Sequence, residues 1–423
     1  MSLLSRSLRL GFCAQLVLLP CLCLTVSEGT GTEPYWNQFR GPHGDGETSI
    51  ELPSEFGESD RVTWKTPIHD KGWSSPVVWG DQIWLTTATE DGKKLYAVCV
   101  NADTGAIEYD ILVFEVAEPK FCHPTNSYAS CTPFVEEGRV YVHFGEYGTA
   151  CLDTNTGEKL WERRDFVCED FRGPASSPIV DGDRLFLLFD GIDNQFVVAL
   201  DKHTGETIWK TIRDIDYGTE EGDYKKGYCT PTLIEVDGQK QIICPAAVET
   251  IAYDPATGEV IWRIRHEGMN AAARPLYENG MVYISAGDGE TSLVALNPEG
   301  TGDVTESHIS WNTGKAVPER SSLIVANDRL YMTSDSGVLS CLDALTGESI
   351  WVKRLTGEYW ASPLLAGENL YFFSKDGKVS VIAAADEYRL VAENQFSDGF
   401  NASPAVIDDA IILRSFTHLY RIE

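Results

Sequence analysis

The stretch CLDTNTGEKLW, residues 151–161, decides the fold of this chain. It places a small residue, an aspartate, a Thr-Gly pair and a tryptophan at fixed spacings. The same pattern returns at 199–209, 252–262 and 341–351, and weaker copies begin at Cys99 and Ala295. Copies of this length, spaced by about 40–53 residues, indicate an array of one structural repeat.

A second pattern precedes each copy and sets the number of repeats. A Ser-Pro or Thr-Pro pair, or a variant of it, is followed by apolar residues, a turn and a predicted strand. These positions are Ser75, Thr132, Ser177, Thr230, Arg274, Ser322, Ser362 and Ser403. The 352 residues from Gly72 to Glu423 therefore divide into eight units of 44, the size of a four-stranded propeller blade. Period-2 runs such as 329–333 and 369–373 are typical of strands with one buried face.

The eighth unit ends after three strands and lacks the Thr-Gly pair and the tryptophan. Near the other end of the chain, residues 63–66 (TWKT) closely resemble the fourth strand at 208–211 (IWKT). We expect residues 61–68 to complete the last blade, because closing the ring removes its open edges. The predicted fold is all-β: an eight-bladed β-propeller over residues 61–423, closed by an N-terminal strand and preceded by an arm over residues 28–60.

The N-terminus predicts export. Residues 1–27 carry Arg6 and Arg9, then an apolar run to Val26 with small residues at the expected cleavage point. This is typical of a signal peptide, with an uncleaved anchor as the alternative. No later stretch is long and apolar enough for a membrane span. We therefore expect an exported, periplasmic or extracellular protein.

The charge of the chain excludes one class of partner. Its 64 acidic residues outnumber its 34 basic residues, which gives a net charge of −30 and a pI near 4.6. Such a surface repels phosphate backbones, so no nucleic-acid partner is expected. The closed ring is expected to be a monomer.

The Asp-x-x-Thr-Gly-x-x-x-Trp repeat resembles that of pyrroloquinoline-quinone (PQQ) propellers. These include quinoprotein dehydrogenases and the propeller lipoprotein of outer-membrane protein assembly. The stretches 35–42 (YWNQFRGP) and 72–76 (GWSSP) resemble a subgroup of exported proteins of planctomycete-type bacteria. The resemblance implies that each repeat tryptophan stacks between blades, against the glycine of the next copy.

The cysteines give one candidate disulfide. Three of the eleven lie in the predicted signal, and Cys99, Cys151 and Cys341 occupy the small-residue position of the repeat, where packing explains them. Cys122 and Cys131 bracket a loop before the second blade, and export permits a bridge between them. The cysteines have no zinc-site spacing.

The candidate binding surface follows from the register of the repeats. Trp73, Tyr228, Arg320 and Trp360 each stand three residues before the proline position of their own unit. Equal register in a ring means equal height and similar radius, so these side chains are expected to converge at one mouth of the central channel. The loops that lead into the first strands complete the predicted ligand- or partner-binding set: Trp73, His123, Arg172, Tyr228, Arg320, Trp360 and Phe400. Acidic residues from a second set of loops reach the same face, although solvated turns favour them too: Glu146, Asp190, Asp193, Asp288, Glu290, Asp335 and Asp376.

Two classes of function remain. One is a non-catalytic scaffold that binds a protein or polysaccharide partner in the cell envelope and needs no cofactor. The alternative is a PQQ- and calcium-dependent alcohol or sugar dehydrogenase, which requires an aromatic platform, carboxylate and amide ligands for calcium, and a carboxylate base. The resemblance implies a bridge between adjacent cysteines in such enzymes, and no adjacent pair occurs here. We favour the scaffold, and assign no catalytic or metal-ligating residue.

Overall fold

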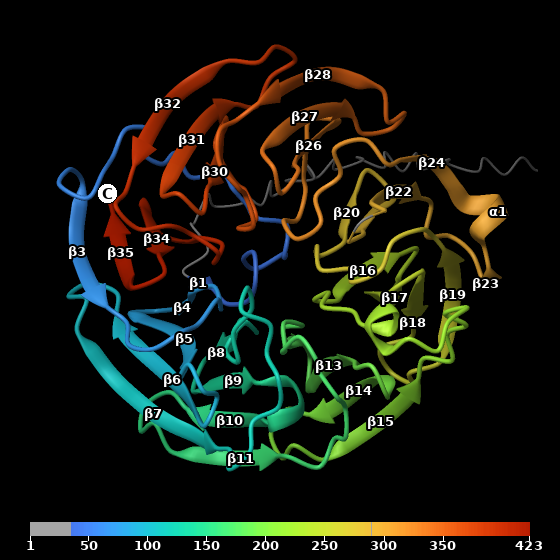
Figure 1. The fold of residues 1–423 in the computed structure, drawn as a ribbon, viewed down its shortest axis with the longest axis horizontal. Coiled ribbons are helices and arrows are strands. Elements are labelled where there is room, and N and C mark those ends of the chain that lie inside the picture. The colour runs from blue at the N-terminus through green and yellow to red at the C-terminus, as the bar shows by residue number, and fades with distance from the viewer. Residues whose placement is uncertain (1–34, 289) are drawn as a thin grey trace, which may run out of the picture. The chain divides into compact units, whose positions relative to one another are not determined.

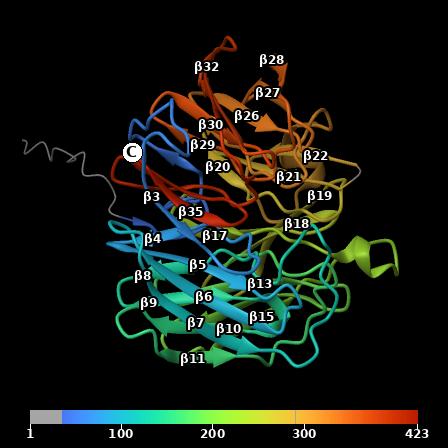
Figure 2. The ribbon, with the colours of Figure 1, turned by 60° about the vertical axis from the view of Figure 1, so that its left-hand side comes forward.

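The computed structural model describes residues 35–288 and 290–423, so the predicted signal peptide lies outside the described residues. Within them, eight antiparallel sheets stand side by side around a central axis (Figure 1). The prediction of an all-β, eight-bladed propeller is confirmed. Figure 2 shows the ring turned by 60°, with the strands of successive blades stacked along it.

Each blade has four strands that run in order from the axis to the rim. Blade 1 has β4 (Val77–Trp79), β5 (Gln82–Ala88), β6 (Lys94–Asn101) and β7 (Ile107–Glu115); blade 2 has β8 (Phe134–Glu136), β9 (Arg139–His143), β10 (Thr149–Asp153) and β11 (Lys159–Arg163). Blade 3 has β12 (Ile179–Asp181), β13 (Arg184–Asp190), β14 (Gln195–Asp201) and β15 (Thr207–Ile212); blade 4 has β16 (Thr232–Val236), β17 (Gln239–Pro245), β18 (Glu249–Tyr253) and β19 (Val260–Arg265).

The second half of the ring repeats this order. Blade 5 has β20 (Leu276–Glu278), β21 (Met281–Ala286), β22 (Ser292–Leu296) and β24 (Ile309–Thr313); blade 6 has β25 (Ile324–Ala326), β26 (Arg329–Thr333), β27 (Val338–Asp343) and β28 (Ser349–Arg354). Blade 7 has β29 (Leu364–Ala366), β30 (Asn369–Phe373), β31 (Lys378–Ala383) and β32 (Leu390–Gln395); blade 8 has β33 (Ala405–Ile407), β34 (Ala410–Arg414), β35 (His418–Ile422) and β3 (Val62–Pro67). Short 3-10 turns η1 (Gly145–Tyr147) and η2 (Gly222–Lys225) lie in the connecting loops.

The repeat motif forms the turn between the third and fourth strands. In blade 2, Oδ1 of Asp153 accepts hydrogen bonds from the backbone N–H groups of Asn155 and Thr156 at 2.8 and 3.0 Å. These bonds hold the pKa of Asp153 below its usual value. Gly157 then takes a left-handed conformation with φ 72°, which glycine adopts without strain. The spacing from aspartate to Thr-Gly is therefore the spacing of one closed turn.

The tryptophan of the motif joins neighbouring blades. Trp209 of blade 3 donates its indole N–H to the carbonyl of Pro255 in blade 4 at 3.1 Å. A Cβ on Gly258 would lie 2.5 Å from the Trp209 ring, so only glycine fits against it. Trp161 and Trp351 donate to the next blade in the same way. The stacking that the resemblance implied is present.

Trp262 departs from this arrangement because an insertion in blade 5 moves the Thr-Gly pair, Thr301–Gly302, away from the motif spacing and out of the tight turn. The insertion in that blade forms β23 (Gly302–Asp303) and α1 (Thr305–His308). Strand β23 pairs in parallel with β19, with Gly302 opposite Trp262. Trp262 is fully buried and donates within its own blade to Gln241 at 2.8 Å. The insertion therefore covers the tryptophan that the missing turn would have covered.

A belt of hydroxyl groups encircles the channel. The Ser or Thr of each Ser/Thr-Pro pair accepts a hydrogen bond from the backbone N–H at the same position of the preceding blade. The seven N–H to oxygen bonds are 2.9–3.0 Å long and run from Ser75 to Thr132, Thr132 to Ser177, Ser177 to Thr230, Arg274 to Ser322, Ser322 to Ser362, Ser362 to Ser403 and Ser403 to Ser75. The belt is interrupted where Arg274 replaces the hydroxyl. This explains why the pair recurs in nearly every unit.

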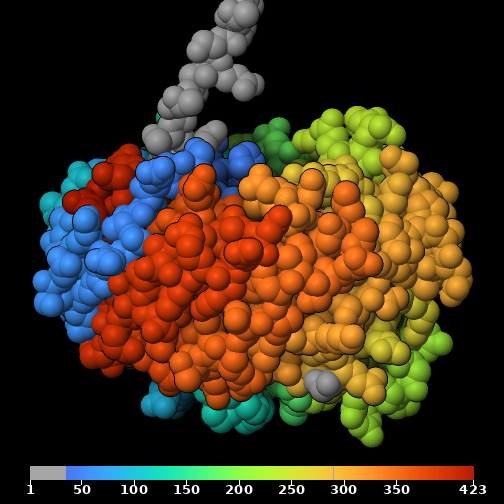
Figure 3. All heavy atoms as spheres, turned by 90° about the horizontal axis from the view of Figure 1, so that it is seen from above, coloured from blue at the N-terminus to red at the C-terminus, as the bar shows by residue number. Residues whose placement is uncertain are grey.

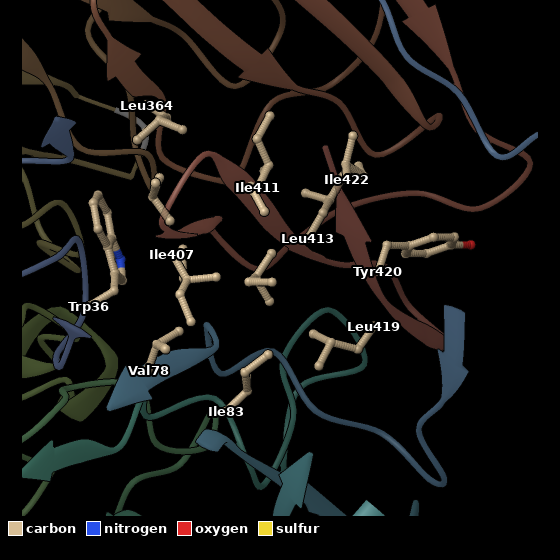
Figure 4. Packing of buried hydrophobic residues seen from close by; sticks show 14 of the residues in the cluster. Trp36, Val78, Ile83, Leu364, Ile407, Ile411, Leu413, Leu419, Tyr420 and Ile422 are labelled. Carbon is tan, nitrogen blue, oxygen red and sulfur yellow. The ribbon is translucent and has the colours of Figure 1, made fainter. Parts of the chain in front are cut away.

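The N-terminal strand closes the ring as predicted. Strand β3 pairs antiparallel with β35, placing Lys65 opposite Tyr420. Trp64 donates its indole N–H to the carbonyl of Ala102 in blade 1 at 2.7 Å, as Trp161, Trp209 and Trp351 do across their own junctions. Figure 4 shows the apolar side chains packed where blade 8 meets blade 1, with Ile407 and Leu419 on the side of Val78 and Ile83.

The arm over residues 35–60 enters the channel, a role that the sequence did not reveal. Strand β1 (Tyr35–Trp36) pairs with β4 of blade 1, and β2 (Glu47–Thr48) pairs with β29 of blade 7. Between them the chain crosses the axis, and its blue ribbon lies inside the ring in Figure 1. In Figure 3 the blue surface continues beside the orange and red blades. The arm thus obstructs the channel.

Arg274 holds this crossing segment. Its guanidinium donates to the carbonyl of Phe39 at 2.5 Å and to Oε1 of Gln38 at 3.0 Å. Gly44 packs against the same guanidinium, since a Cβ there would lie 2.3 Å from it. Burial lowers the pKa of Arg274 to about 10. The residue that breaks the hydroxyl belt therefore anchors the arm.

Candidate ligand cavity at the channel mouth

One mouth of the channel opens into a cavity of about 290 Å³. In all eight units the residue three positions before the proline position lines it, which adds Ser130, Ala175, Ala272 and Asn401 to Trp73, Tyr228, Arg320 and Trp360. Each blade contributes one side chain at this height. The small side chains, such as Ala175 and Ala272, leave space between the large side chains. The lining also includes six hydroxyl residues of the belt: Ser75, Thr132, Ser177, Thr230, Ser362 and Ser403.

Phe39 of the N-terminal arm also lines the cavity. It comes from the segment that crosses the axis between β1 and β2, below the register of the mouth. The arm therefore makes the channel mouth a blind pocket with an aromatic floor. Nothing in the repeat pattern signals this residue, since it precedes the first unit.

Three aromatic rings of the wall each have a lysine or arginine against them. The Arg320 guanidinium lies 4.4 Å from the centre of the Trp360 ring, and Lys375 Nζ lies 3.6 Å from it. Lys71 and Lys226 lie 5.3 and 4.7 Å from the rings of Trp73 and Tyr228. These cation–π contacts hold the rings in place.

Both arginines of the wall are paired with carboxylates. Arg172 contacts Asp223 and lies 3.1 Å from Asp288. Burial alone would lower the pKa of Arg172, but these carboxylates raise it above its usual value. Of the two, only Asp288 belongs to the acidic set named from the sequence.

Arg320 is paired in the same manner. It contacts Asp335 and lies 2.9 Å from Oε2 of Glu319. Burial opposes its charge, and Asp335 and Glu319 raise its pKa above the usual value. Burial and the charge of Asp335 in turn raise the pKa of Glu319.

The remaining predicted residues divide between the wall and the core. The structure places His123 in the cavity wall, where its Nδ1 lies 2.7 Å from Oγ1 of Thr125. Phe400 is fully buried against Phe373 and Phe396, so its side chain lies in the core rather than at the mouth. We expected Phe400 at the mouth because its loop leads into a first strand. It stands one residue before the register residue of its blade, Asn401, and its side chain points into the core.

A buried charge network stands behind the wall. Lys226 Nζ lies 2.8 Å from Asp170, and Arg213 lies 2.5 Å from Asp190. Asp190, one of the acids named from the sequence, is therefore an internal ion-pair member rather than a surface residue. Burial raises its pKa, and burial lowers the pKa of the neighbouring His143 to about 4.

Cys122 and Cys131 are both free thiols, so the predicted bridge is not formed. The Cys122 sulfur lies 3.7 Å from the carbonyl oxygen of Arg172 in the next loop. Cys131 is buried beside the belt, where burial raises its pKa. The two side chains serve different packing sites.

The donor set does not fit a calcium–PQQ pair. The aromatic platform that PQQ needs is present in Trp73 and Trp360, but calcium needs several gathered oxygen ligands. Asp288 and Glu319, the carboxylates of the wall, instead bond to arginines. Across residues 35–288 and 290–423, no three His, Cys, Asp or Glu side chains are placed to share a metal ion.

In the part of the chain that the structure describes, no helix has the length and apolar character needed to cross a membrane.

Among curated proteins, outer membrane protein assembly factor BamB of Shewanella oneidensis is 22% identical over 308 residues, covering 68% of this chain and 72% of that one. Quinoprotein alcohol dehydrogenase PedH of Pseudomonas putida is 27% identical over 194 residues, which are 44% of this chain and 29% of the dehydrogenase.

This chain shares its fold with solved structures of both an assembly factor and a dehydrogenase. BamB of Moraxella catarrhalis has a TM-score of 0.60 at 12% identity, covering 85% of this chain and 99% of that one. Quinohemoprotein alcohol dehydrogenase of Comamonas testosteroni has a TM-score of 0.67 at 12% identity, covering 93% and 81%. At these identities the likeness concerns the fold alone.

A family model described as outer membrane protein assembly factor BamB matches residues 54–220, 193–315 and 301–390, most of the ring. The chain therefore belongs to this family of PQQ-repeat propellers.

Proposed function

We propose that this protein is a non-catalytic binding propeller of the cell envelope, which holds a protein or polysaccharide partner at the channel mouth. The observation that carries the proposal is the cavity itself, a blind pocket of about 290 Å³ into which every blade directs one residue. Pockets of this kind, with apolar walls and a few placed polar groups, are typical ligand sites.

The chemistry of the wall favours binding over catalysis. The carboxylates that could act as bases, Asp288 and Glu319, are engaged by Arg172 and Arg320. A relative named as an outer membrane assembly factor supports a location in the envelope and a role in holding partners. The predicted signal peptide is consistent with this location. We propose a monomer that needs neither PQQ nor calcium.

The experiment is sedimentation of the purified protein with a washed cell-envelope fraction of the source organism. Trp360→Ala and Arg320→Ala remove one aromatic face and one cation from the mouth, and are expected to lower the fraction bound. Two matched controls are Tyr388→Ala, a half-buried aromatic residue between β31 and β32 at the rim, and Arg354→Ala on the outer strand β28. Both controls are expected to bind like the unaltered protein.

Melting temperatures of all four variants separate lost binding from lost folding. If the mouth variants melt normally and sediment as well as the controls, the partner binds elsewhere and the proposal is wrong.

A further inference from the structure

The charges around the cavity compensate one another, which disfavours an anionic ligand. Each wall arginine contacts two carboxylates: Arg172 meets Asp223 and Asp288, and Arg320 meets Glu319 and Asp335. A carboxylated ligand would have to displace one of these partners and then face the others. The guanidinium groups are therefore part of the wall rather than open anion sites.

A cationic ligand is disfavoured for a different reason. Aromatic faces attract cations, but here the protein supplies the cation itself. Trp360 has Arg320 and Lys375 within 4.4 and 3.6 Å of its ring centre, and Lys71 lies 5.3 Å from that of Trp73. A further positive charge would meet repulsion from these groups at close range. The cavity suits a neutral ligand.

Among residues 35–288 and 290–423, three oxygen atoms of the lining residues are buried and have no hydrogen-bond partner: Tyr228 Oη, Asn270 Oδ1 and Asn401 Oδ1. The Asn270 amide is oriented, because its nitrogen donates to Asp288 at 3.2 Å. An amide oxygen can only accept, so a ligand that satisfies these groups must carry donors. Buried polar groups left unpaired are unfavourable, and slight turns of the side chains toward a donor would relieve this.

The size of the cavity restricts the ligand further. A volume of about 290 Å³ lies at the lower end of the ~300–1,000 Å³ typical of ligand pockets. Its walls include the indole rings of Trp73 and Trp360 and hydroxyls from the belt. A ligand that matches needs one face of C–H groups for the rings and an edge of hydroxyl groups for the oxygens.

We propose that the cavity binds a neutral, hydroxyl-bearing sugar ring. This rests on the proposed function, since it names the chemical class held at the same mouth. The ring is a free sugar or one unit of an envelope glycan, two sources with the same recognising chemistry. Trp73 and Trp360 pack against its faces, while Asn270, Asn401 and Tyr228 receive or exchange its hydroxyl hydrogen bonds.

Isothermal titration calorimetry of the full protein tests this with matched sugars. The panel holds glucose, galactose and mannose, the uronate and amino-sugar analogue of each, N-acetylglucosamine and the β-1,4-linked disaccharides. At least one neutral sugar is expected to bind, with its uronate and amine at least about tenfold weaker. A disaccharide that binds more tightly than its single ring assigns a glycan chain, and equal affinities assign a free sugar or chain end.

Two cavity variants tie the signal to the site. Trp360→Phe and Asn401→Ala are each expected to weaken binding of the neutral sugar by about tenfold or more, while Tyr388→Ala at the rim binds normally. No heat from any neutral sugar, equal binding of a charged analogue, or unchanged affinity in both variants would overturn the inference. If sugars fail while envelope sedimentation still depends on Trp360 and Arg320, only this inference fails and the proposed function stands.

Discussion

Ser403 donates its backbone N–H to Oγ of Ser75 at 3.0 Å, although 328 residues separate them in the chain. This bond joins the last blade to the first and completes the run of hydroxyl contacts around the channel, apart from the position held by Arg274. Six of the seven serine and threonine side chains of the belt also line the cavity, so these residues both link the blades and form the binding wall.

Adjacent serines in blade 3 test the energetic role of the belt. Oγ of Ser177 accepts from the Thr132 N–H, whereas Oγ of the neighbouring Ser176 has no partner among the residues that the structure describes. Ser177→Ala leaves a buried N–H unpaired and is expected to lower the unfolding free energy by about 1–3 kcal/mol. Ser176→Ala is expected to change it little. Chemical denaturation of both variants measures the difference, and equal costs would contradict the role assigned to the belt.

The interblade tryptophans are expected to carry stability. Trp161→Ala, Trp209→Ala and Trp262→Ala should each lower the unfolding free energy by roughly 3–5 kcal/mol. Trp262 is expected at the upper end because it is fully buried, whereas the other two are partly exposed. Thermal and denaturant melting provide the measurement. Variants that melt normally would show that the stacking is not a source of stability.

Gly258 of blade 4 packs against the Trp209 ring of blade 3, so a substitution at this glycine tests the same blade junction from the other side. Its φ is 75°, and a Cβ would lie 2.5 Å from the Trp209 ring. Gly258→Ala is therefore expected to destabilise the protein by more than 1 kcal/mol through backbone strain and steric overlap. Gly238→Ala is the control, since it has a similar φ of 79° but open space around the added atom. A larger loss in Gly258→Ala than in Gly238→Ala, seen in the same melts, isolates the contact.

Anchoring of the arm is measurable through Arg274. Arg274→Lys keeps the charge but cannot reproduce the paired bonds to Phe39 and Gln38. Amide hydrogen exchange over residues 36–48 is expected to accelerate, while Arg354→Lys on the outer rim leaves it unchanged. Exchange at the original rate would mean that strands β1 and β2 hold the arm without this arginine.

Glu47 in β2 predicts a pH dependence of stability. Burial, together with the nearby charge of Asp45, raises the pKa of Glu47 from 4.5 to about 8. The folded protein therefore holds this proton more tightly than the unfolded chain, and the unfolding free energy falls as the pH rises from about 5 to about 8. Glu47→Gln should flatten this decline in denaturation curves at successive pH values, whereas the exposed Glu51→Gln should not. Parallel declines in all three proteins would refute the assignment.

Addition of PQQ and calcium tests the alternative function. Because Asp288 and Glu319 are bonded to arginines, we expect no quinone absorbance on the repurified protein and no alcohol-dependent dye reduction. The measurement needs only the purified chain, both additives and a primary alcohol. Dye reduction that requires both additives and disappears in Trp360→Ala would establish the dehydrogenase instead.

The fold was predictable because its determinants are local and repeated. The turn from Asp153 to Gly157 recurs with the same spacing, so each copy strengthens the assignment of the other copies. Residues 63–66 resemble a fourth strand, which is the strand that the eighth unit lacks. The wall of the cavity followed from the same periodicity, since residues in equal register lie at equal height. Phe400 was misplaced for the converse reason: one residue off the register, it points into the core.

Features outside the repeat could not be predicted in this way. Phe39 and Gln38 come from a segment that has no internal copy, and their position depends on contacts with Arg274, more than two hundred residues away. The pairing of Arg172 with Asp223 and Asp288 likewise joins separate loops. Such contacts depend on side-chain directions that no spacing along the chain encodes.

The pairing of β3 with β35 imposes an order on folding. Residues 62–67 are synthesised about 350 residues before their partner, 418–422, so at about 5–20 residues per second they wait roughly 20–70 s. During that interval β3 is an unpaired edge, the kind of segment that promotes aggregation. Its side chains discourage pairing with other chains during this interval, because Lys65 places a charge in the middle of the strand and Thr63 and Thr66 are polar. Blades 1 to 7 contain their four strands in sequence and can form before the ring closes, so closure is a late step that requires residues 418–422.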